Sequence, residues 1–279
     1  MADSMLDEVG ALLREAAATA ILPRFGRLGG SDVEEKTPGE LVTVADREAE
    51  QIISAGLRRL LPGSVVVGEE AVAADADVLT RLHGTAPVWL VDPLDGTANF
   101  AAGRRPFAVM VALLRDGVTE ASWILDPVAD RLVVARAGVG AYVDGVRVRT
   151  TDPAPPRADL RGAVLTRFLP TSLQVRVTAG AGGLGELLPG HHCAGQEYPD
   201  IVLGVQHFAI FWRTLPWDHA PGALLVREAG GVVRRLDGGE YDPTDEQSGL
   251  LAAANEQVWS DVYEALLAGS VDPVDPEVS

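Results

Sequence analysis

Between Phe107 and Val148 the sequence alternates short apolar runs with turn signals, a pattern typical of consecutive antiparallel strands. The expected strands are residues 107–114, 121–125, 131–135, 141–143 and 146–148. Asp144-Gly145, between the last two, is a dipeptide typical of a tight β-hairpin. This stretch restricts the first half of the chain to folds that contain an antiparallel sheet.

The segments on either side of this sheet show both helical and strand patterns. Helices are expected at 6–21, 45–61, 171–180, 220–228 and 256–267, and strands at 64–67, 88–91, 162–166, 208–211, 232–236 and 250–254. Residues 29–39 are expected to form a polar loop. The one convincing interior linker is 151–156 (TDPAPP). We therefore expect two domains, 1–150 and 157–270, and a disordered tail at 271–279.

Composition excludes several classes of partner. The 279 residues carry 23 Lys+Arg against 40 Asp+Glu, a formal net charge of −17. Nucleic-acid polymers and anionic membranes are bound mainly by basic surface, so we expect binding to neither. The first helix lacks a basic leader, and no apolar run reaches the length of a membrane span. With a single cysteine, Cys193, no internal disulfide can form, and we expect a cytoplasmic protein.

The apolar strand expected at 88–91 stops abruptly and places two carboxylates, Asp92 and Asp95, on one turn. Crowding two carboxylates is unfavourable unless a cation lies between them, and the nearest basic residues are Arg104 and Arg105. A divalent ion such as Mg²⁺ takes oxygen ligands of this kind, often together with a substrate phosphate. The alternative is an Asx-turn, in which each aspartate accepts hydrogen bonds from its own backbone.

Other acidic residues also stand at strand ends or helix starts. Glu69 and Glu70 follow a strand, Asp46 begins one helix, and Asp218 stands at the start of another. Acidic residues gathered in this way are how α/β-type proteins build metal sites. Each position also has a simpler explanation, because Asp46 and Asp218 suit helix N-caps and the two glutamates suit a solvated turn.

The ordered strings around these residues resemble the inositol monophosphatase family. They are VGEE at 67–70, WLVDPLDGTANF at 89–100 and WDHAPGALLVREAGG at 217–231, and the segment 36–46 is similar to the family's N-terminal motif. Order and spacing match over about residues 5–268. The resemblance implies a magnesium-dependent, lithium-sensitive phosphatase. It also implies an α+β fold, a two-lobed αβαβα sandwich of the inositol monophosphatase and fructose-1,6-bisphosphatase type, with the active site between the lobes.

The resemblance further implies a ligand set for the metal. A first Mg²⁺ would be bound by Glu69, Asp92 and the carbonyl oxygen of Leu94. A second would be bound by Asp92, Asp95 and Asp218, and a third, weaker ion would use Glu69. Two metal ions suit this reaction because they neutralise charge on both the attacking and the leaving oxygen of a phosphate ester.

The remaining catalytic roles also come from the resemblance. Asp46 and Thr97 would orient and activate the attacking water, with Glu69 as the metal ligand beside it. The backbone N–H groups of Gly96 and Thr97 would receive phosphate oxygens, and glycine suits this position because it has no Cβ. Glu70 would support the neighbouring metal ligand.

The sequence departs from the family at the positions expected to contact the leaving group. Inositol phosphatases carry a glutamate seven residues before the aspartate of the Trp-Asp motif, where this chain has Phe211, which cannot accept hydrogen bonds from hydroxyl groups. We expect Gln196, Tyr198, Phe211 and Arg213 to shape a different substrate pocket. The alternatives are that some of them, Phe211 included, are core residues, and that Arg213 pairs with a local acid.

These observations predict a phosphomonoesterase that acts on small polyol or sugar phosphates similar to inositol 1-phosphate. Histidinol phosphate, fructose 1,6-bisphosphate and a 3′-phosphonucleotide are the alternative substrates. A family member that has become a non-catalytic binding or regulatory protein is the alternative class. The resemblance also implies a homodimer, although the sequence alone does not fix the assembly.

Overall fold

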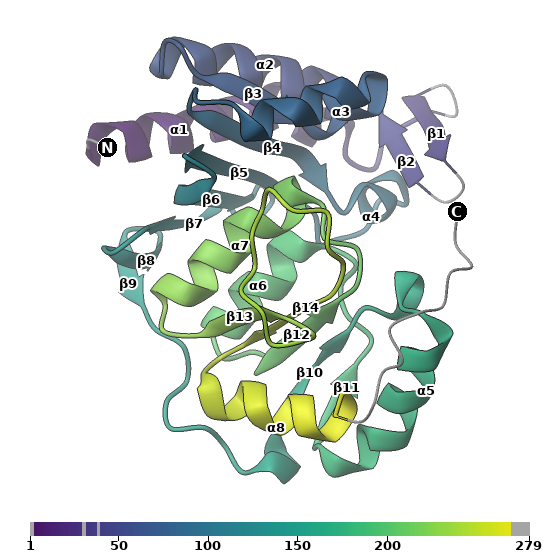
Figure 1. The fold of residues 1–279 in the computed structure, drawn as a ribbon. Helices are drawn as coiled ribbons and strands as arrows, with labels where there is room; N and C mark the ends of the chain where they lie inside the picture. The colour runs from purple at the N-terminus through teal and green to yellow at the C-terminus, as the bar shows by residue number, and fades with distance from the viewer. Residues whose placement is uncertain (1–2, 30–31, 38–39, 269–279) are drawn as a thin grey trace.

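The computed structural model describes residues 3–29, 32–37 and 40–268 of the chain, and its elements stack in layers (Figure 1). In order, the layers are N-terminal helices, a seven-stranded sheet, two central helices, a five-stranded sheet and two final helices. The predicted αβαβα sandwich is therefore confirmed. The predicted tail at 271–279 lies outside the described residues. In the described part of the chain, no helix combines the length and apolar character needed to cross a bilayer.

The first sheet contains the meander predicted between residues 107 and 148. Its strands are β3 (Val65–Gly68), β4 (Val88–Asp95), β5 (Ala108–Arg115), β6 (Val118–Asp126), β7 (Arg131–Arg136), β8 (Gly140–Val143) and β9 (Val146–Val148), paired in sequence order. β3 and β4 run parallel, and every later pair is antiparallel. The prediction of antiparallel strands is confirmed, and one parallel pair extends the sheet.

Successive side chains of β4 enter two different hydrophobic cores. Trp89 and Val91 pack with the N-terminal helices, whereas Val88 and Leu90 pack toward the central helices. Because both faces of the strand are covered, its sequence is a continuous apolar run rather than an alternating one. Asp92 follows in the same strand, so a carboxylate emerges directly from the most buried part of the sheet.

The N-terminal layer contains one error of the sequence analysis. Its elements are α1 (Asp3–Ala16), a π-helical turn (Ala17–Ile21), a 3-10 turn (Leu22–Arg24), β1 (Val33–Thr37), β2 (Glu40–Thr43) and α2 (Val44–Leu60). β1 and β2 form an antiparallel ribbon where a polar loop was expected. The prediction was wrong because the first strand, VEEKT, has no regular apolar alternation to mark it. Glu69 and Glu70 open α3 (Glu69–Ala74), so they do not form the solvated turn considered as an alternative.

The second sheet is mixed, as predicted. Its strands are β10 (Arg161–Val164), β11 (Glu186–Leu188), β12 (Phe208–Phe211), β13 (Val232–Arg235) and β14 (Leu250–Ala253), in the order β11-β10-β12-β14-β13. β10 runs parallel to β11 and β12, and the remaining pairs are antiparallel. Helices α5 (Thr171–Gly180) and α8 (Glu256–Leu266) cover its outer face. The division into two domains at 151–156 stays a prediction.

Two helices, α6 (Ala194–Val202) and α7 (Pro216–Glu228), lie between the sheets (Figure 1). α6 was not predicted. α7 begins at Pro216 rather than at Ala220, so Asp218 falls in its first turn. Pro221 then lies inside the helix, where it cannot donate the usual hydrogen bond to the carbonyl group four residues earlier.

The close approach of these two helices generates a prediction about stability. A Cβ atom added at Gly222 of α7 would fall 1.9 Å from Cδ2 of Tyr198 in α6. Gly222→Ala is therefore expected to lower the free energy of unfolding by about 1–3 kcal/mol, the usual range for overpacked cores. Urea denaturation measures this loss. Gly182→Ala is the control, because nothing lies within 4 Å of its added Cβ. Equal stability of the two variants would contradict the packing described.

Candidate functional site

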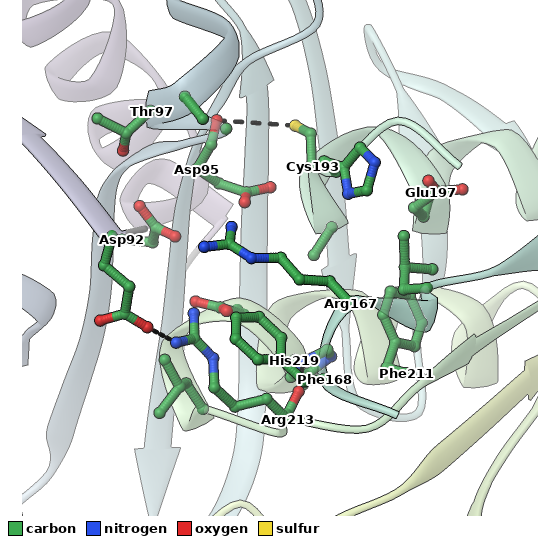
Figure 2. Close-up of a pocket in the computed structure, with 18 of the residues that line it drawn as sticks. Asp92, Asp95, Thr97, Arg167, Phe168, Cys193, Glu197, Phe211, Arg213 and His219 are labelled. Atoms are coloured by element: carbon green, nitrogen blue, oxygen red, sulfur yellow. Dashed lines mark hydrogen bonds and ion pairs between the residues drawn. The ribbon is translucent and has the colours of Figure 1, made fainter. Parts of the chain in front are cut away.

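A pocket of about 190 Å³ lies where the C-terminal end of β4 meets the central helices (Figure 2). The predicted metal-binding positions all line it: Glu69, Asp92, Leu94, Asp95 and Asp218. They come from α3, from β4 and from α7, which lie far apart in the sequence. The fold therefore brings together the acidic positions singled out in the sequence.

Hydrogen bonds hold the two aspartates of β4 in different directions. The strand pairing of β4 with β5 is irregular between Asp92 and Asp95. Within that irregular stretch, Asp92 Oδ1 accepts a hydrogen bond from the Leu94 N–H at 2.9 Å. Asp95 Oδ2 instead accepts one from the N–H of Gly195 in α6, at 2.6 Å. The first contact is the Asx-type bond considered as an alternative. The second ties the end of β4 to the central helices.

Glu69 and Asp218 enter the pocket from the first turns of α3 and α7. A helix N-terminus favours a carboxylate because its first N–H groups have no partner within the helix and its dipole is positive there. Glu50 of α2 accepts hydrogen bonds from the N–H groups of Glu70 at 2.8 Å and of Ala71 at 2.9 Å. Glu50 therefore fixes the start of α3, and with it the position of Glu69.

One cation accompanies the glutamates. Lys36 Nζ lies 3.0 Å from Glu69 Oε1 and also donates a hydrogen bond to Glu70. Glu70 is thus engaged by Lys36 through its side chain and by Glu50 through its backbone. This supporting position agrees with the role expected for Glu70 beside the predicted metal ligand.

Burial raises the pKa of the pocket aspartates. For Asp92 the pKa rises well above its ordinary value because of burial, and the nearby charges of Glu69, Asp95 and Asp218 raise it further. For Asp218 burial is again the largest cause, while Arg213 and a hydrogen bond with Asp92 act in the opposite direction. Burial raises the pKa of Asp95 to about 6. These carboxylates repel one another at neutral pH, and a bound cation would relieve that repulsion.

The donor set fits a hard divalent cation, because it consists of carboxylate oxygens and the carbonyl of Leu94. Among the described residues, no three side chains of the Asp, Glu, His or Cys types already surround one point as a formed metal site. The carboxyl groups of Asp92 and Asp218 lie close enough for each to affect the pKa of the other, and a bound cation would make this proximity favourable.

Thr97 and Asp46 form a connected pair beside the carboxylates. Thr97 lines the pocket, and its hydroxyl lies 3.0 Å from Asp46 Oδ1 and 2.9 Å from the Leu94 carbonyl oxygen. Asp46 is fully buried, and its Oδ2 accepts from the backbone N–H and the hydroxyl of Thr43 at 2.9 and 2.6 Å. Burial raises the pKa of Asp46 to about 7. Thr97 therefore faces the pocket, and Asp46 contacts Thr97 from its buried side.

Gly96 is required by the backbone as well as by its place in the pocket. Its φ of +85° lies in the left-handed region that favours glycine. An added Cβ would lie 3.0 Å from the Pro106 carbonyl oxygen and 3.3 Å from Cys193 Cβ. Any side chain at this position would therefore press against Pro106, which precedes β5, and against Cys193, which precedes α6.

Two of the predicted substrate contacts do not line the pocket. Tyr198 has no exposed surface, and its ring stacks on Phe211 with the centroids 5.0 Å apart. Gln196 is turned toward Arg131, 3.2 Å away, and also hydrogen-bonds Asp200. Both residues lie on α6, a helix that the sequence analysis did not identify, and their side chains are outside the pocket lining.

Phe211 and Arg213 line the pocket. Phe211 is only 5% exposed, so it serves as pocket wall and core residue at once. Arg213 pairs with Glu40, the local acid considered as an alternative, while still facing the pocket. Its guanidinium also lies 4.5 Å from the ring centre of Phe168.

A buried histidine next to Asp218 was missed by the sequence analysis. Burial lowers the pKa of His219 to about 3, so its imidazole is neutral. Because a carbonyl oxygen only accepts, His219 Nε2–H donates to the Arg213 carbonyl at 2.9 Å. His219 Nδ1 then accepts from the Tyr198 hydroxyl at 2.8 Å. This connection holds the backbone of Arg213 against the start of α7, and no sequence motif indicated it.

The repulsion within the pocket generates a prediction about the metal-free protein. Asp92→Asn keeps an oxygen that can accept from Leu94 but removes one buried charge. We expect it to raise the melting temperature in EDTA at pH 7.5 by roughly 2–4 °C, equivalent to about 1 kcal/mol. Calorimetry measures the shift, with the exposed Asp237→Asn as control.

The pH dependence of this effect has a defined sign. The pKa of Asp92 is raised in the folded state above its ordinary value of 3.8, so the folded protein binds more protons than the unfolded chain above about pH 4. The contribution of Asp92 to the stability of the metal-free protein therefore falls as the pH rises above about 4, and the stability advantage of Asp92→Asn grows with it. An Asn variant that is less stable than the parent in EDTA at pH 7.5 would contradict this account.

Comparison with known proteins matches nearly the whole chain to one family. The profile of the inositol monophosphatase family matches residues 3–272. An inositol-1-monophosphatase from Mesorhizobium japonicum is 33% identical, with 92% of this chain and 94% of that protein covered. The Nus factor SuhB of Pseudomonas aeruginosa is 34% identical, with 80% of this chain and 82% of that protein covered.

Solved structures share the fold. The extragenic suppressor protein suhB from Bartonella henselae matches with a TM-score of 0.83 and 26% identity, over 96% of this chain and 100% of that one. The IMPase of Thermotoga maritima matches with a TM-score of 0.77 and 24% identity, over 94% and 98%, a likeness that concerns the fold alone. Because the family profile spans nearly the whole sequence and the relatives share both sequence and fold, the chain belongs to the inositol monophosphatase family.

Proposed function

We propose that this protein is a Mg²⁺-dependent phosphomonoesterase that uses water to hydrolyse small polyol or sugar phosphates. The observation that carries the proposal is the gathering of Glu69, Asp92, Asp95 and Asp218 around one pocket beside Thr97. Family membership supports a phosphatase, since relatives are named inositol-1-monophosphatase and fructose-1,6-bisphosphatase/inositol-1-monophosphatase.

The proposed ligands follow from the pocket lining. Glu69, Asp92 and the Leu94 carbonyl would hold one Mg²⁺, and Asp92, Asp95 and Asp218 a second, with a third, weaker site at Glu69. When bound, such ions lower the pKa of water and neutralise charge on the phosphate and the leaving oxygen. Glu50 and Lys36 support this arrangement by fixing the start of α3 and balancing its charge.

Thr97 is the residue proposed to orient the attacking water. With Asp46 ionised, the single hydroxyl proton of Thr97 is donated to Asp46, and the oxygen lone pairs can accept a hydrogen bond from water in the pocket. Asp46 does not reach the pocket and is a positioning residue for Thr97. Because Thr43 holds the other oxygen of Asp46, Asp46 Oδ1 is kept in position to accept the hydrogen bond from Thr97.

The phosphate would sit at the start of α4 (Thr97–Ala101), against Gly96. The first N–H groups of a helix have no partner within the helix and can donate to phosphate oxygens. The N–H groups of Gly96 and Thr97 are the proposed donors. The left-handed turn at Gly96 brings the backbone to the pocket surface without a side chain in front of it.

The central test is phosphate release from inositol 1-phosphate and from p-nitrophenyl phosphate. We expect turnover that needs Mg²⁺, stops in EDTA and falls roughly 10³-fold or more in Asp92→Asn, because a ligand shared by both ions is lost. Circular dichroism checks that the variant folds, and Asp237→Asn is the control. Full activity of Asp92→Asn, or turnover that persists in EDTA, would contradict the proposal.

A second prediction separates the role of Thr97 from metal binding. Thr97→Val keeps the shape of the side chain but removes the hydroxyl group. Loss of a group that orients the reacting water is expected to lower kcat by about 10²–10³-fold. The Mg²⁺ concentration at half-maximal activity should change little, because Thr97 is not a proposed ligand. A Thr97→Val enzyme with parental kcat would contradict this role.

The alternative is a protein of this family that binds a partner and does not catalyse. Relatives named Nus factor SuhB are the observation behind it. The same assay discriminates, because a non-catalytic protein releases no phosphate from any ester at any Mg²⁺ concentration.

A further inference from the structure

We propose that His192 binds a free hydroxyl group of the leaving group and thereby selects polyol phosphates over simple alkyl or aryl phosphates. This inference rests on the phosphatase function proposed above and names a residue that determines the specificity of the same pocket. His192 lines the pocket and is exposed. In the part of the chain that the structure describes, its imidazole has no hydrogen-bond partner, unlike those of His191 and His219. The imidazole is therefore available to a ligand.

The backbone of His192 has an unusual conformation. Its φ of +55° lies in the left-handed region, which residues other than glycine seldom adopt. Such a conformation is unfavourable by itself and is kept only where the surrounding structure enforces it, which is common at binding sites. Gly190, two residues earlier, also has a positive φ of +75°, so the chain bends sharply over residues 190–192. This bend brings His192 to the pocket lining.

Hydrogen bonds on both sides of His192 hold this bend in place. The buried carboxyl group of Glu197 accepts from the backbone N–H of His191, and the side-chain amide of Asn99 donates to the His191 carbonyl oxygen at 2.9 Å. On the other side, the Cys193 carbonyl oxygen accepts from the backbone N–H of Glu197 at 3.1 Å. A ligand of His192 would therefore not have to order this loop, which lowers the entropic cost of binding.

His192 also stands next to the proposed phosphate site. The following residue, Cys193, has its Cβ 3.3 Å from the position of a Cβ added at Gly96, and its thiol lies 3.7 Å from the carbonyl oxygen of Asp95. The backbone N–H groups of Gly96 and Thr97 are the proposed donors to the phosphate. A phosphate held there would place its leaving group within reach of the side chain at position 192.

The chemistry of an imidazole matches a hydroxyl group. A neutral imidazole has one N–H donor and one nitrogen acceptor, and a hydroxyl group can pair with either. A hydroxyl group that enters the pocket leaves water, so it favours binding only where a polar partner replaces its lost hydrogen bonds. The side chains of Leu165, Phe168, Phe211 and Leu215, which also line the pocket, have no polar atom. His192 supplies such a partner outside the proposed metal site.

The test compares esters with and without hydroxyl groups, using the full-length enzyme at saturating Mg²⁺. Glycerol 2-phosphate and isopropyl phosphate are both esters of a secondary carbon, but only glycerol 2-phosphate has hydroxyl groups beside that carbon. Phenyl phosphate is a second ester without a hydroxyl group, and its leaving group is better. The change in kcat/KM between parent and variant, measured for each ester, removes the difference in intrinsic reactivity among the three.

Variants at position 192 assign the preference to the imidazole. His192→Gly removes the ring and suits the left-handed backbone. It should lower kcat/KM for glycerol 2-phosphate by about 3–10-fold, the usual effect of one lost hydrogen bond, mainly through KM. The values for isopropyl and phenyl phosphate should change by less than about 2-fold. His192→Asn should show a smaller loss, because asparagine tolerates the same backbone and carries both a donor and an acceptor.

A matched control separates the role of the imidazole from the effect of the added glycine. Asp116→Gly also replaces an exposed residue with a left-handed backbone, at φ +50°, but Asp116 is not part of the pocket lining. We expect this variant to keep the parental kcat/KM for all three esters.

The outcomes distinguish this inference from the function on which it rests. Equal losses of His192→Gly on all three esters, or no loss on glycerol 2-phosphate, would overturn the role of His192 while the phosphatase function stands. No Mg²⁺-dependent hydrolysis of any ester, p-nitrophenyl phosphate included, would overturn the phosphatase function and this inference together.

Discussion

The mutual repulsion of Glu69, Asp92, Asp95 and Asp218 is the constraint on which the rest of this structure depends. The elements that carry these carboxylates are held in place by contacts elsewhere in the fold, so the fold supplies the free energy that keeps like charges together. Burial is the largest cause of the raised pKa values of Asp92, Asp95 and Asp218, and the neighbouring carboxylates raise them further. A divalent cation would turn this unfavourable arrangement into a binding site, and its binding free energy would then stabilise the fold.

The layered architecture explains how such a cluster can exist at all. β4 is covered on both faces, which makes the position of Asp92 rigid. The two central helices form one side of the pocket next to it. Asp95 is tied to α6 through Gly195, and Asp218 is set by the first turn of α7, which His219 links to Tyr198. The site therefore depends on helix packing between the sheets as much as on its own ligands.

Each acidic position of the pocket follows a local signal, a strand end or a helix start, but that signal also suits a helix N-cap or a turn. The ligand set itself came from the resemblance to the family. Thr97 and Gly96 belong to the same sequence motif as Asp92 and Asp95, and the structure places them in the same pocket. Tyr198 and Gln196 lie on α6, which contains Pro199 and was not identified as a helix from the sequence. Glu50 and His219 act through contacts that depend on tertiary packing, so no local pattern of residues indicated their roles.

The most direct test of the central claim is a crystal structure with Mn²⁺, whose anomalous scattering locates the metal without assumptions about ligands. The account predicts anomalous peaks among the carboxylates of Asp92, Asp95 and Asp218 and toward Glu69, with the Asp92 oxygens contacting more than one ion. Strong peaks elsewhere in the molecule, or none in this pocket at saturating Mn²⁺, would contradict it.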